Sequence, residues 1–169
     1  MLALGFDASV EGAAFALLRV DALRREYVDH GVCATEVELV RKLESSKDVS
    51  VIGIEIPVGG LCTKLGDDAG SRKRGEALIR TASTAHFVRG YVTATRGKDS
   101  VEAMPSYVAR KYIGLGRSAT DAQVTLALRA FVPTWPSRSN DHHRDAAVVA
   151  IAAAMIHLAR DRIRASTRA

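Results

Sequence analysis

The sequence predicts an α/β fold in which a mixed central β-sheet is flanked by helices. Short apolar segments typical of strands occupy the first third of the chain, and segments with helical spacing occupy most of the rest. With 169 residues and 47% hydrophobic content, the chain can bury one substantial core and is too short for two ordinary domains. We therefore expect a single domain over residues 1–169, in which residues 160–169 form a basic C-terminal tail.

The first three strands are expected close together. Residues 2–9 and 13–20 are apolar runs, and the short segment between them has the character of a turn, which predicts a hairpin. Residues 27–33 can form a third strand. Three successive strands with short connections are typical of antiparallel neighbours in a sheet.

A helix and a buried strand follow. Residues 35–44 have the spacing of a helix, and residues 51–56 form an unbroken apolar strand that carries one charge, Glu55. Three early strands, a crossover helix and a buried fourth strand together predict a mixed sheet.

Helical segments dominate the remainder of the chain. A long glycine-rich loop after Pro57, VGGLCTKLGDDAG, leads to helical spacing over residues 71–91, with basic residues on one side. A short strand and two helices are then expected at residues 101–103, 106–112 and 118–131. The last of these is capped by Ser118 or Thr120. A final helix begins near Asp141, runs through HHRDAAVVAIAAAMIHLA and frays into an arginine-rich tail.

The net charge of +5 is unevenly distributed. Residues 71–111 hold nine basic and three acidic side chains, a local +6, whereas residues 21–55 hold eight acidic and five basic ones, a local −3. A basic half in an otherwise balanced protein indicates an anionic partner, and nucleic acid is the commonest one. A solvated helix face would have the same composition.

Composition also argues against several classes of protein. No apolar run approaches the roughly 20 residues that span a bilayer, and the first residues lack the pattern of a signal peptide, so we expect a cytoplasmic protein. Cys33 and Cys62 stand far apart, which favours neither a disulfide framework nor a zinc ribbon. The GLG segment at residues 114–116 lacks the pattern of a nucleotide-binding phosphate loop.

Three acidic residues lie in apolar surroundings, where an unpaired charge is costly. Asp7 ends the first strand, Glu55 lies within the fourth, and Asp145 is near the start of the alanine-rich final helix. If the first and fourth strands are neighbours, Asp7 and Glu55 meet at one edge of the sheet, and the final helix can lie across them. Three acids would repel one another there unless a cation were present.

Such a cluster suits two-metal hydrolysis of a phosphodiester, in which oxygen ligands hold two divalent ions roughly 4 Å apart. A fourth ligand could come from NDHHRDAAV: both His142 and Asp141 share a helix face with Asp145, whereas His143 does not. We favour His142 narrowly over Asp141. Taken singly, each acid has an ordinary explanation, such as a turn cap, an arginine partner or a favourable place at a helix N-terminus.

Four segments in order, LGFDAS, IGIEIP, YIGLGRSATDAQV and HHRDAAVVAIAAA, resemble the RuvC family of Holliday junction resolvases. The resemblance covers most of the chain. Its strongest parts are Asp7, Glu55 and the H-x-x-D-A pattern of His142, Asp145 and Ala146. The GLG turn with the following Gln-Val pair resembles the connector of that family.

The resemblance implies a ribonuclease H-like fold, a homodimer, and two Mg²⁺ ions in each active site, with Mn²⁺ able to substitute. It implies symmetric cleavage of four-way DNA junctions, without a nucleotide cofactor. Asp7 would bridge the metals, Glu55 and Asp145 would complete the ligation, and His142 would take the variable fourth position. The side chains expected to hold DNA phosphates are Lys64, Arg72, Lys73, Arg74, Arg80, Arg110, Lys111 and Arg117.

The chain departs from the family pattern at two places. Pro57 and Val58 occupy positions where many members have an aromatic residue that stacks on an unpaired base. Asp121 stands where a lysine is common, with Arg117 close by in sequence. These differences favour an enzyme with relaxed selectivity among branched DNAs. Two alternatives stay open: a ribonuclease H-like nuclease that processes RNA, and a catalytically silent dimer that binds junctions.

Overall fold

A computed structural model of the chain describes residues 1–9, 12–21, 24–57 and 69–167, with side chains from residue 76 onward in the last range. Within this part, five strands form one sheet in the order β3-β2-β1-β4-β5. The strands are β1 (Leu2–Ser9), β2 (Gly12–Val20), β3 (Arg25–Cys33), β4 (Val51–Glu55) and β5 (Val101–Met104). β1, β2 and β3 pair antiparallel, whereas β4 pairs parallel with β1 and β5 parallel with β4. The predicted mixed sheet is confirmed.

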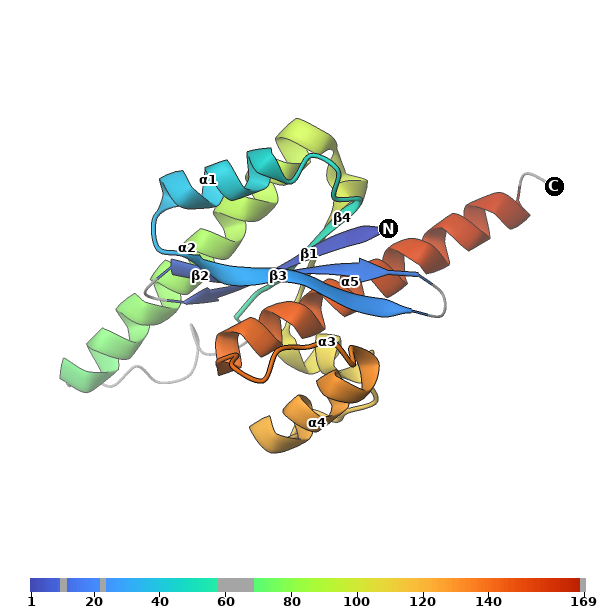
Figure 1. The fold of residues 1–169 in the computed structure, drawn as a ribbon. Coiled ribbons are helices and arrows are strands. Elements are labelled where there is room, and N and C mark those ends of the chain that lie inside the picture. The colour runs from blue at the N-terminus through green and yellow to red at the C-terminus, as the bar shows by residue number, and fades with distance from the viewer. Residues whose placement is uncertain (10–11, 22–23, 58–68, 168–169) are drawn as a thin grey trace.

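Helices cover both faces of the sheet (Figure 1). They are α1 (Glu36–Ser45), α2 (Ala69–Arg96), α3 (Ser106–Lys111), α4 (Asp121–Phe131) and α5 (Asp141–Ser166). α1 and α2 lie on one face, and α5 crosses the other with α3 and α4 beside it. The result is a three-layer α/β arrangement with a hydrophobic core on each side of the sheet.

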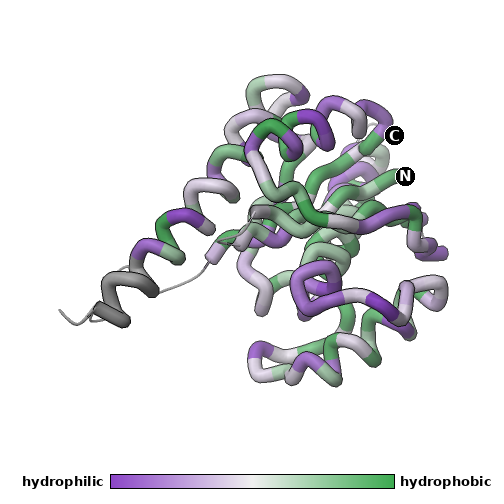
Figure 2. The backbone as a smooth tube through the Cα atoms, turned by 60° about the vertical axis from the view of Figure 1, so that its left-hand side comes forward, coloured by the Kyte–Doolittle hydropathy of each residue, from purple (hydrophilic) through white to green (hydrophobic). Residues whose placement is uncertain are grey.

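The apolar strand pattern explains why the sheet is buried between these layers. Alternate side chains of β1 point to opposite faces, so that Leu4 and Phe6 enter the core under α1 and α2, while Ala3 enters the core under α5. The strands are hydrophobic along much of their length in Figure 2, and hydrophilic residues gather on the outer helices and loops. No helix in the described ranges is long and apolar enough to cross a membrane.

The predicted helix starts are confirmed by their caps. Thr120, and not Ser118, caps α4: its hydroxyl accepts from the backbone N–H of Gln123, and the Gln123 side chain accepts from the Thr120 N–H. Thr35 caps α1 by accepting from the backbone N–H of Glu38, whose carboxylate accepts from the N–H of Ala34. Asn140 caps α5 by accepting from the backbone N–H of His143 at 2.9 Å.

The final helix extends into the arginine-rich segment in which it was expected to fray. α5 continues to Ser166, and its last turns are held to the neighbouring β5 region by ion pairs. Arg160 pairs with Glu102, and Arg164 Nη2 lies 2.9 Å from Asp99 Oδ2. The arginine-rich segment is therefore helical as far as Ser166, and two of its arginines pair with acidic residues distant in sequence.

Two glycines set the distance between α5 and the sheet. A Cβ added to Gly5 would lie 1.9 Å from the carbonyl oxygen of Ala146, and one added to Gly53 would lie 2.6 Å from that of Val149. No larger residue fits at either place without moving the helix. Gly5 and Gly53 are register partners on β1 and β4, so α5 rests directly on the centre of the sheet.

Candidate metal centre

The carboxylates of Asp7, Glu55 and Asp145 meet at one edge of the sheet. β1 and β4 run parallel with Phe6 opposite Ile54, so the next residues, Asp7 and Glu55, end up side by side. Asp145 begins the second turn of α5, which lies over this edge. One carboxylate oxygen from each of the three lies within 4.8 Å of the others.

The two close-packing glycines also explain the direction of the acidic side chains. Because side chains alternate along a strand, Asp7 shares a face with Gly5, and Glu55 shares a face with Gly53. That face is the one covered by α5. The motifs G-x-D and G-x-E thus combine an acid with the small residue that brings the third acid, on α5, close to it.

Burial and mutual repulsion dominate the electrostatics of this cluster. Burial raises the pKa of Asp7 to about 6, despite the opposing effect of its hydrogen bond with His142. Burial, followed by the charges of Asp7 and Asp145, raises the pKa of Glu55 to about 8. Burial also raises the pKa of Asp145, although Arg110 lowers it. The charged forms of the three carboxylates are therefore disfavoured unless a further positive charge is present.

One oxygen of Glu55 is left unsatisfied. Ser106, the first residue of α3, hydrogen-bonds the Glu55 carboxylate, but its Oε2 atom is buried and has no hydrogen-bond partner in the described part of the chain. A buried carboxylate oxygen without a partner is costly. Three carboxylates with an orphaned oxygen form the donor set that hard divalent cations such as Mg²⁺ and Mn²⁺ prefer, so the residues fit a metal ion.

His142 reaches the cluster from the first turn of α5. Its Nδ1 atom lies 2.7 Å from Asp7 Oδ2, and its side chain remains 57% exposed. The other two candidates for the fourth position point elsewhere. Asp141 pairs with Arg144, and the ring of His143 packs edge-on against His30 with centroids 4.5 Å apart.

Arg110, which the sequence predicts to contact a DNA phosphate, lies against the same acidic cluster. Its Nη2 atom is 3.2 Å from Asp145 Oδ1, and its Nη1 atom donates to the carbonyl of Ala119 at 3.3 Å. The side chain is only 15% exposed. Ser106, unlike Arg110, was not singled out from the sequence, since a serine at the start of a short helix is common and only the fold places it beside Glu55.

The remaining basic candidates belong to several parts of the chain. Arg80 is exposed on α2, Lys111 is exposed at the end of α3, and Arg117 stacks over the Tyr107 ring at 5.2 Å. Lys64 lies outside the described residues. The backbones of Arg72, Lys73 and Arg74 belong to the first turns of α2, while their side chains lie outside the described part.

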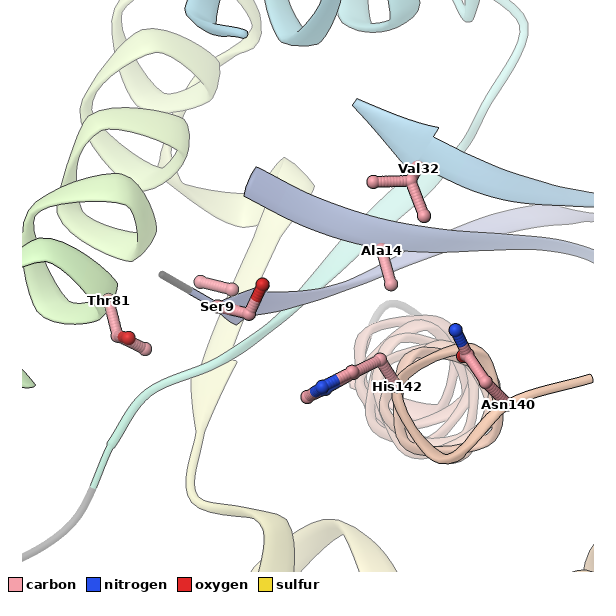
Figure 3. A pocket seen from close by; sticks show the side chains of 7 residues that line it. Ser9, Ala14, Val32, Thr81, Asn140 and His142 are labelled. Atoms are coloured by element: carbon pink, nitrogen blue, oxygen red, sulfur yellow. The ribbon is translucent and has the colours of Figure 1, made fainter. Parts of the chain in front are cut away.

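An open pocket of about 520 Å³ adjoins the metal-site edge (Figure 3). His142 and Asn140 contribute to it from α5, and Thr81 faces them from α2. Ser9, at the end of β1, lies between the two helices. His142 thus links the pocket to the acidic cluster, because its exposed ring lines the pocket and contacts Asp7.

No protein-family model and no curated protein matches the chain. Its structure is similar to two solved structures of RuvC from Thermus thermophilus. The first has a TM-score of 0.65 at 14% sequence identity, covering 95% of this chain and 96% of that one. The second, RuvC in complex with a Holliday junction substrate, has a TM-score of 0.63 at 14% identity with the same coverage. The chain thus has a RuvC-like α/β fold of the ribonuclease H-like class.

Proposed function

We propose that this chain is a single-domain, metal-dependent endonuclease that cuts Holliday junctions and other branched DNA. One observation carries the proposal: three carboxylates from three separate elements, Asp7, Glu55 and Asp145, place oxygen atoms within 4.8 Å of one another. A fold does not by itself imply an activity. The residues at this edge nevertheless have the chemistry that phosphodiester hydrolysis requires.

The proposed cofactor is a pair of Mg²⁺ ions, for which Mn²⁺ can substitute. Bound there, divalent ions would supply a hydroxide nucleophile and stabilise the leaving oxygen. Asp7, Glu55 and Asp145 would hold these ions. His142 would be the fourth ligand, and its imidazole increases the preference for Mn²⁺ relative to an all-carboxylate set.

Residues outside the ligand set would keep these groups in place. The Ser106 side chain hydrogen-bonds the Glu55 carboxylate, and Arg110 donates a hydrogen bond to the Asp145 carboxylate. The unpaired Oε2 of Glu55 is then left for the cation. Such supporting hydrogen bonds orient metal ligands and tune their affinity.

Two further features support DNA as the partner. A solved structure with the same fold holds a Holliday junction substrate, and the region of residues 71–111 has a local charge of +6. We propose that the chain works as a homodimer, because two sites related by a twofold axis can cut a twofold-symmetric junction symmetrically. Affinity should then fall steeply with salt, since neutralised phosphates release counterions.

The test is cleavage of a labelled immobile four-way junction beside a linear duplex and an RNA–DNA hybrid of equal length. Each substrate is incubated with Mg²⁺, Mn²⁺ or a chelator. Paired cuts near the branch point that need metal and are absent from the duplex are expected. Preferential cleavage of the hybrid would instead indicate an RNA-processing nuclease, and binding without cleavage in either metal would indicate a silent junction-binding dimer.

Metal binding is tested separately from activity. Calorimetric titration with Mn²⁺ should give a binding signal for the wild type and a much weaker one for Asp7→Asn, because one charged oxygen ligand is lost. Equal binding by both proteins would remove Asp7 from the ligand set.

A further inference from the structure

Four ring side chains form a cluster where the outer strand β3 meets the first turn of α5. They are Tyr27 and His30 of β3, Trp135 in the segment before α5, and His143 of α5, and we call them the ring cluster. The Nδ1 atom of His30 lies 2.8 Å from the Tyr27 hydroxyl oxygen. The centroid of the His30 ring lies 5.8 Å from that of Trp135 and 4.5 Å from that of His143. His30 therefore contacts all three other members.

The segment that precedes α5 is bound to β3 through this cluster. The backbone N–H of Tyr27 donates to the hydroxyl of Thr134 at 2.9 Å, and the Tyr27 ring lies edge-on to that of Trp135 with centroids 5.6 Å apart. Trp135 is only 5% exposed, and its Nε1 atom donates to the hydroxyl of Ser139 at 2.9 Å. Because Asn140, the N-cap of α5, comes next, contacts with β3 fix the place where the helix begins.

Within α5, two adjacent histidines reach two different strands. The Nδ1 atom of His142 lies 2.7 Å from Oδ2 of Asp7 near the end of β1. The ring of His143 has both nitrogens buried and stands at 85° to the ring of His30 on β3. Successive residues of an α-helix point about 100° apart around its axis. The first turn of α5 is therefore held in two directions at once, by β1 and by β3.

The rotation of this turn decides which side chain faces the acidic cluster. Asp141 points about 100° away from His142, on the side opposite to His143. A rotation that brought Asp141 to Asp7 would turn His143 away from His30 by the same angle. The contact between the rings of His143 and His30 therefore favours His142 over Asp141 as the fourth residue of the metal centre.

We propose that His30 is a positioning residue for the metal centre: by packing against His143, it fixes the rotation of α5 that presents His142 to the cation. The inference rests on the proposed function and adds what sets the fourth ligand. Because an imidazole favours Mn²⁺ relative to a carboxylate, His30 then also influences the choice of metal. His30 is not among the three clustered carboxylates, so it acts on the cation through α5.

Pulsed EPR of the protein loaded with substoichiometric Mn²⁺ tests this role, because coupling to ¹⁴N reports an imidazole bound to the ion. His30→Ala removes the ring, whereas His30→Phe keeps a ring that can pack against His143. Val28→Ala is the matched control, since Val28 is 41% exposed on the same strand and is not part of the ring cluster. His142→Asp assigns the signal, because the coupling must disappear with that imidazole.

We expect ¹⁴N coupling in the wild type, in His30→Phe and in Val28→Ala, and its loss in His142→Asp. In His30→Ala the coupling should fall at least about threefold at equal bound Mn²⁺, and calorimetry should show an affinity for Mn²⁺ about 10-fold weaker. If His30 only stabilised the fold, His30→Ala would lower the Tm and leave the coupling of the folded, loaded protein intact. That result would overturn the inference, as would an equal loss of coupling in His30→Phe, which retains the ring packing.

The outcomes separate this inference from the proposed function. If the wild type binds Mn²⁺ without ¹⁴N coupling, His142 is not a ligand and the role of His30 is overturned, while the carboxylate centre stands. If the coupling behaves as expected but no branched DNA is cut, the proposed function fails and the positioning role stands. If the wild type binds no Mn²⁺, both fail.

A milder variant covers the case in which His30→Ala does not fold. Tyr27→Phe removes only the hydroxyl that contacts His30 Nδ1 and keeps the ring that packs on Trp135. We expect its ¹⁴N coupling to decrease in the same direction as in His30→Ala, because the His30 ring loses the group that holds it. Coupling and Mn²⁺ affinity equal to those of the wild type would overturn the inference.

Discussion

The Nδ1 atom of His142 lies 2.7 Å from Oδ2 of Asp7, although 135 positions separate the two residues along the chain. This contact joins the first turn of α5 to the end of β1. It places an exposed imidazole next to an aspartate side chain that is only 10% exposed. The edge of the buried acidic cluster is therefore reachable from solvent through His142.

Asp7→Asn should abolish cleavage while junction binding is retained. Asparagine keeps the shape of the side chain but removes a charged metal ligand, so we expect the rate to fall by at least about 1000-fold. Binding should persist because removing a negative charge reduces repulsion with phosphate. Single-turnover cleavage and gel-shift titration of the same junction measure the two effects, and cleavage near the wild-type rate would rule Asp7 out.

The metal-free protein should lose stability as pH rises from about 4 to about 8. In the unfolded chain Asp7 and Glu55 release their protons near their ordinary pKa of about 4, whereas in the fold they hold them until pKa values of about 6 and about 8. The unfolded state therefore binds fewer protons across this window, and stability falls as pH rises.

Thermal unfolding in chelator measures this dependence. Glu55→Gln should have a flatter profile and, at pH 8, a Tm higher than the wild type by at least about 3 °C, which is roughly 1 kcal/mol for a chain of this length. Addition of Mn²⁺ to the wild type should raise its Tm at pH 8 more than at pH 5. A wild-type profile that rises with pH over this range would contradict the electrostatics of the cluster.

His142→Asp should shift the metal preference of cleavage from Mn²⁺ toward Mg²⁺. The replacement makes the set of four all-carboxylate, which hard cations prefer. We expect the ratio of rates in Mn²⁺ and Mg²⁺ to fall about 10-fold. Asp141→Asn serves as the control, because Asp141 pairs with Arg144 and not with the cluster. If Asp141→Asn changed the ratio and His142→Asp did not, the fourth position would belong to Asp141.

Arg110→Met should destabilise the metal-free protein by about 1–3 kcal/mol, because Asp145 loses its charged hydrogen-bond partner inside a half-buried cluster. Saturating Mn²⁺ should reduce the difference from the wild type, since the cation replaces the lost positive charge. Lys111→Met, at the exposed next position, should leave the Tm unchanged within about 1 °C. Chemical denaturation with and without Mn²⁺ measures the free energy of unfolding of each variant. Equal destabilisation by the two variants would show that the contact of Arg110 with Asp145 does not stabilise the fold.

Gly5→Ala should destabilise the fold by at least about 3 kcal/mol, because the new methyl group would overlap the Ala146 carbonyl and push α5 off the sheet. Gly90→Ala, on the exposed side of α2 with no atom within 4 Å of the new methyl, should instead stabilise by about 0.5–1 kcal/mol. Urea denaturation compares them. A small effect of Gly5→Ala would mean that α5 rests less closely on the sheet than described.

Much of the fold was predictable because local patterns agree with the final architecture. Alternating and continuous apolar runs predicted β1 to β4, and Thr35, Thr120 and Asn140 cap helices that they precede directly. The partners of the last turns of α5 were not predictable, because Asp99 and Glu102 lie some sixty positions earlier in the chain. Local sequence carries no information about partners that only the fold brings near.

The sequence by itself determined which residues are costly to bury: Asp7, Glu55 and Asp145 stand in apolar segments, and that cost predicted a shared cation. Only the tertiary structure decided how they meet, through the parallel pairing of β1 with β4 and the close approach of α5 over Gly5 and Gly53. It also decided that His142 and not Asp141 touches the cluster, and that Arg110 faces Asp145. Helical spacing puts both His142 and Asp141 on the same face of α5 as Asp145. Which of the two contacts the acidic cluster depends on the rotation of α5 about its axis relative to the sheet.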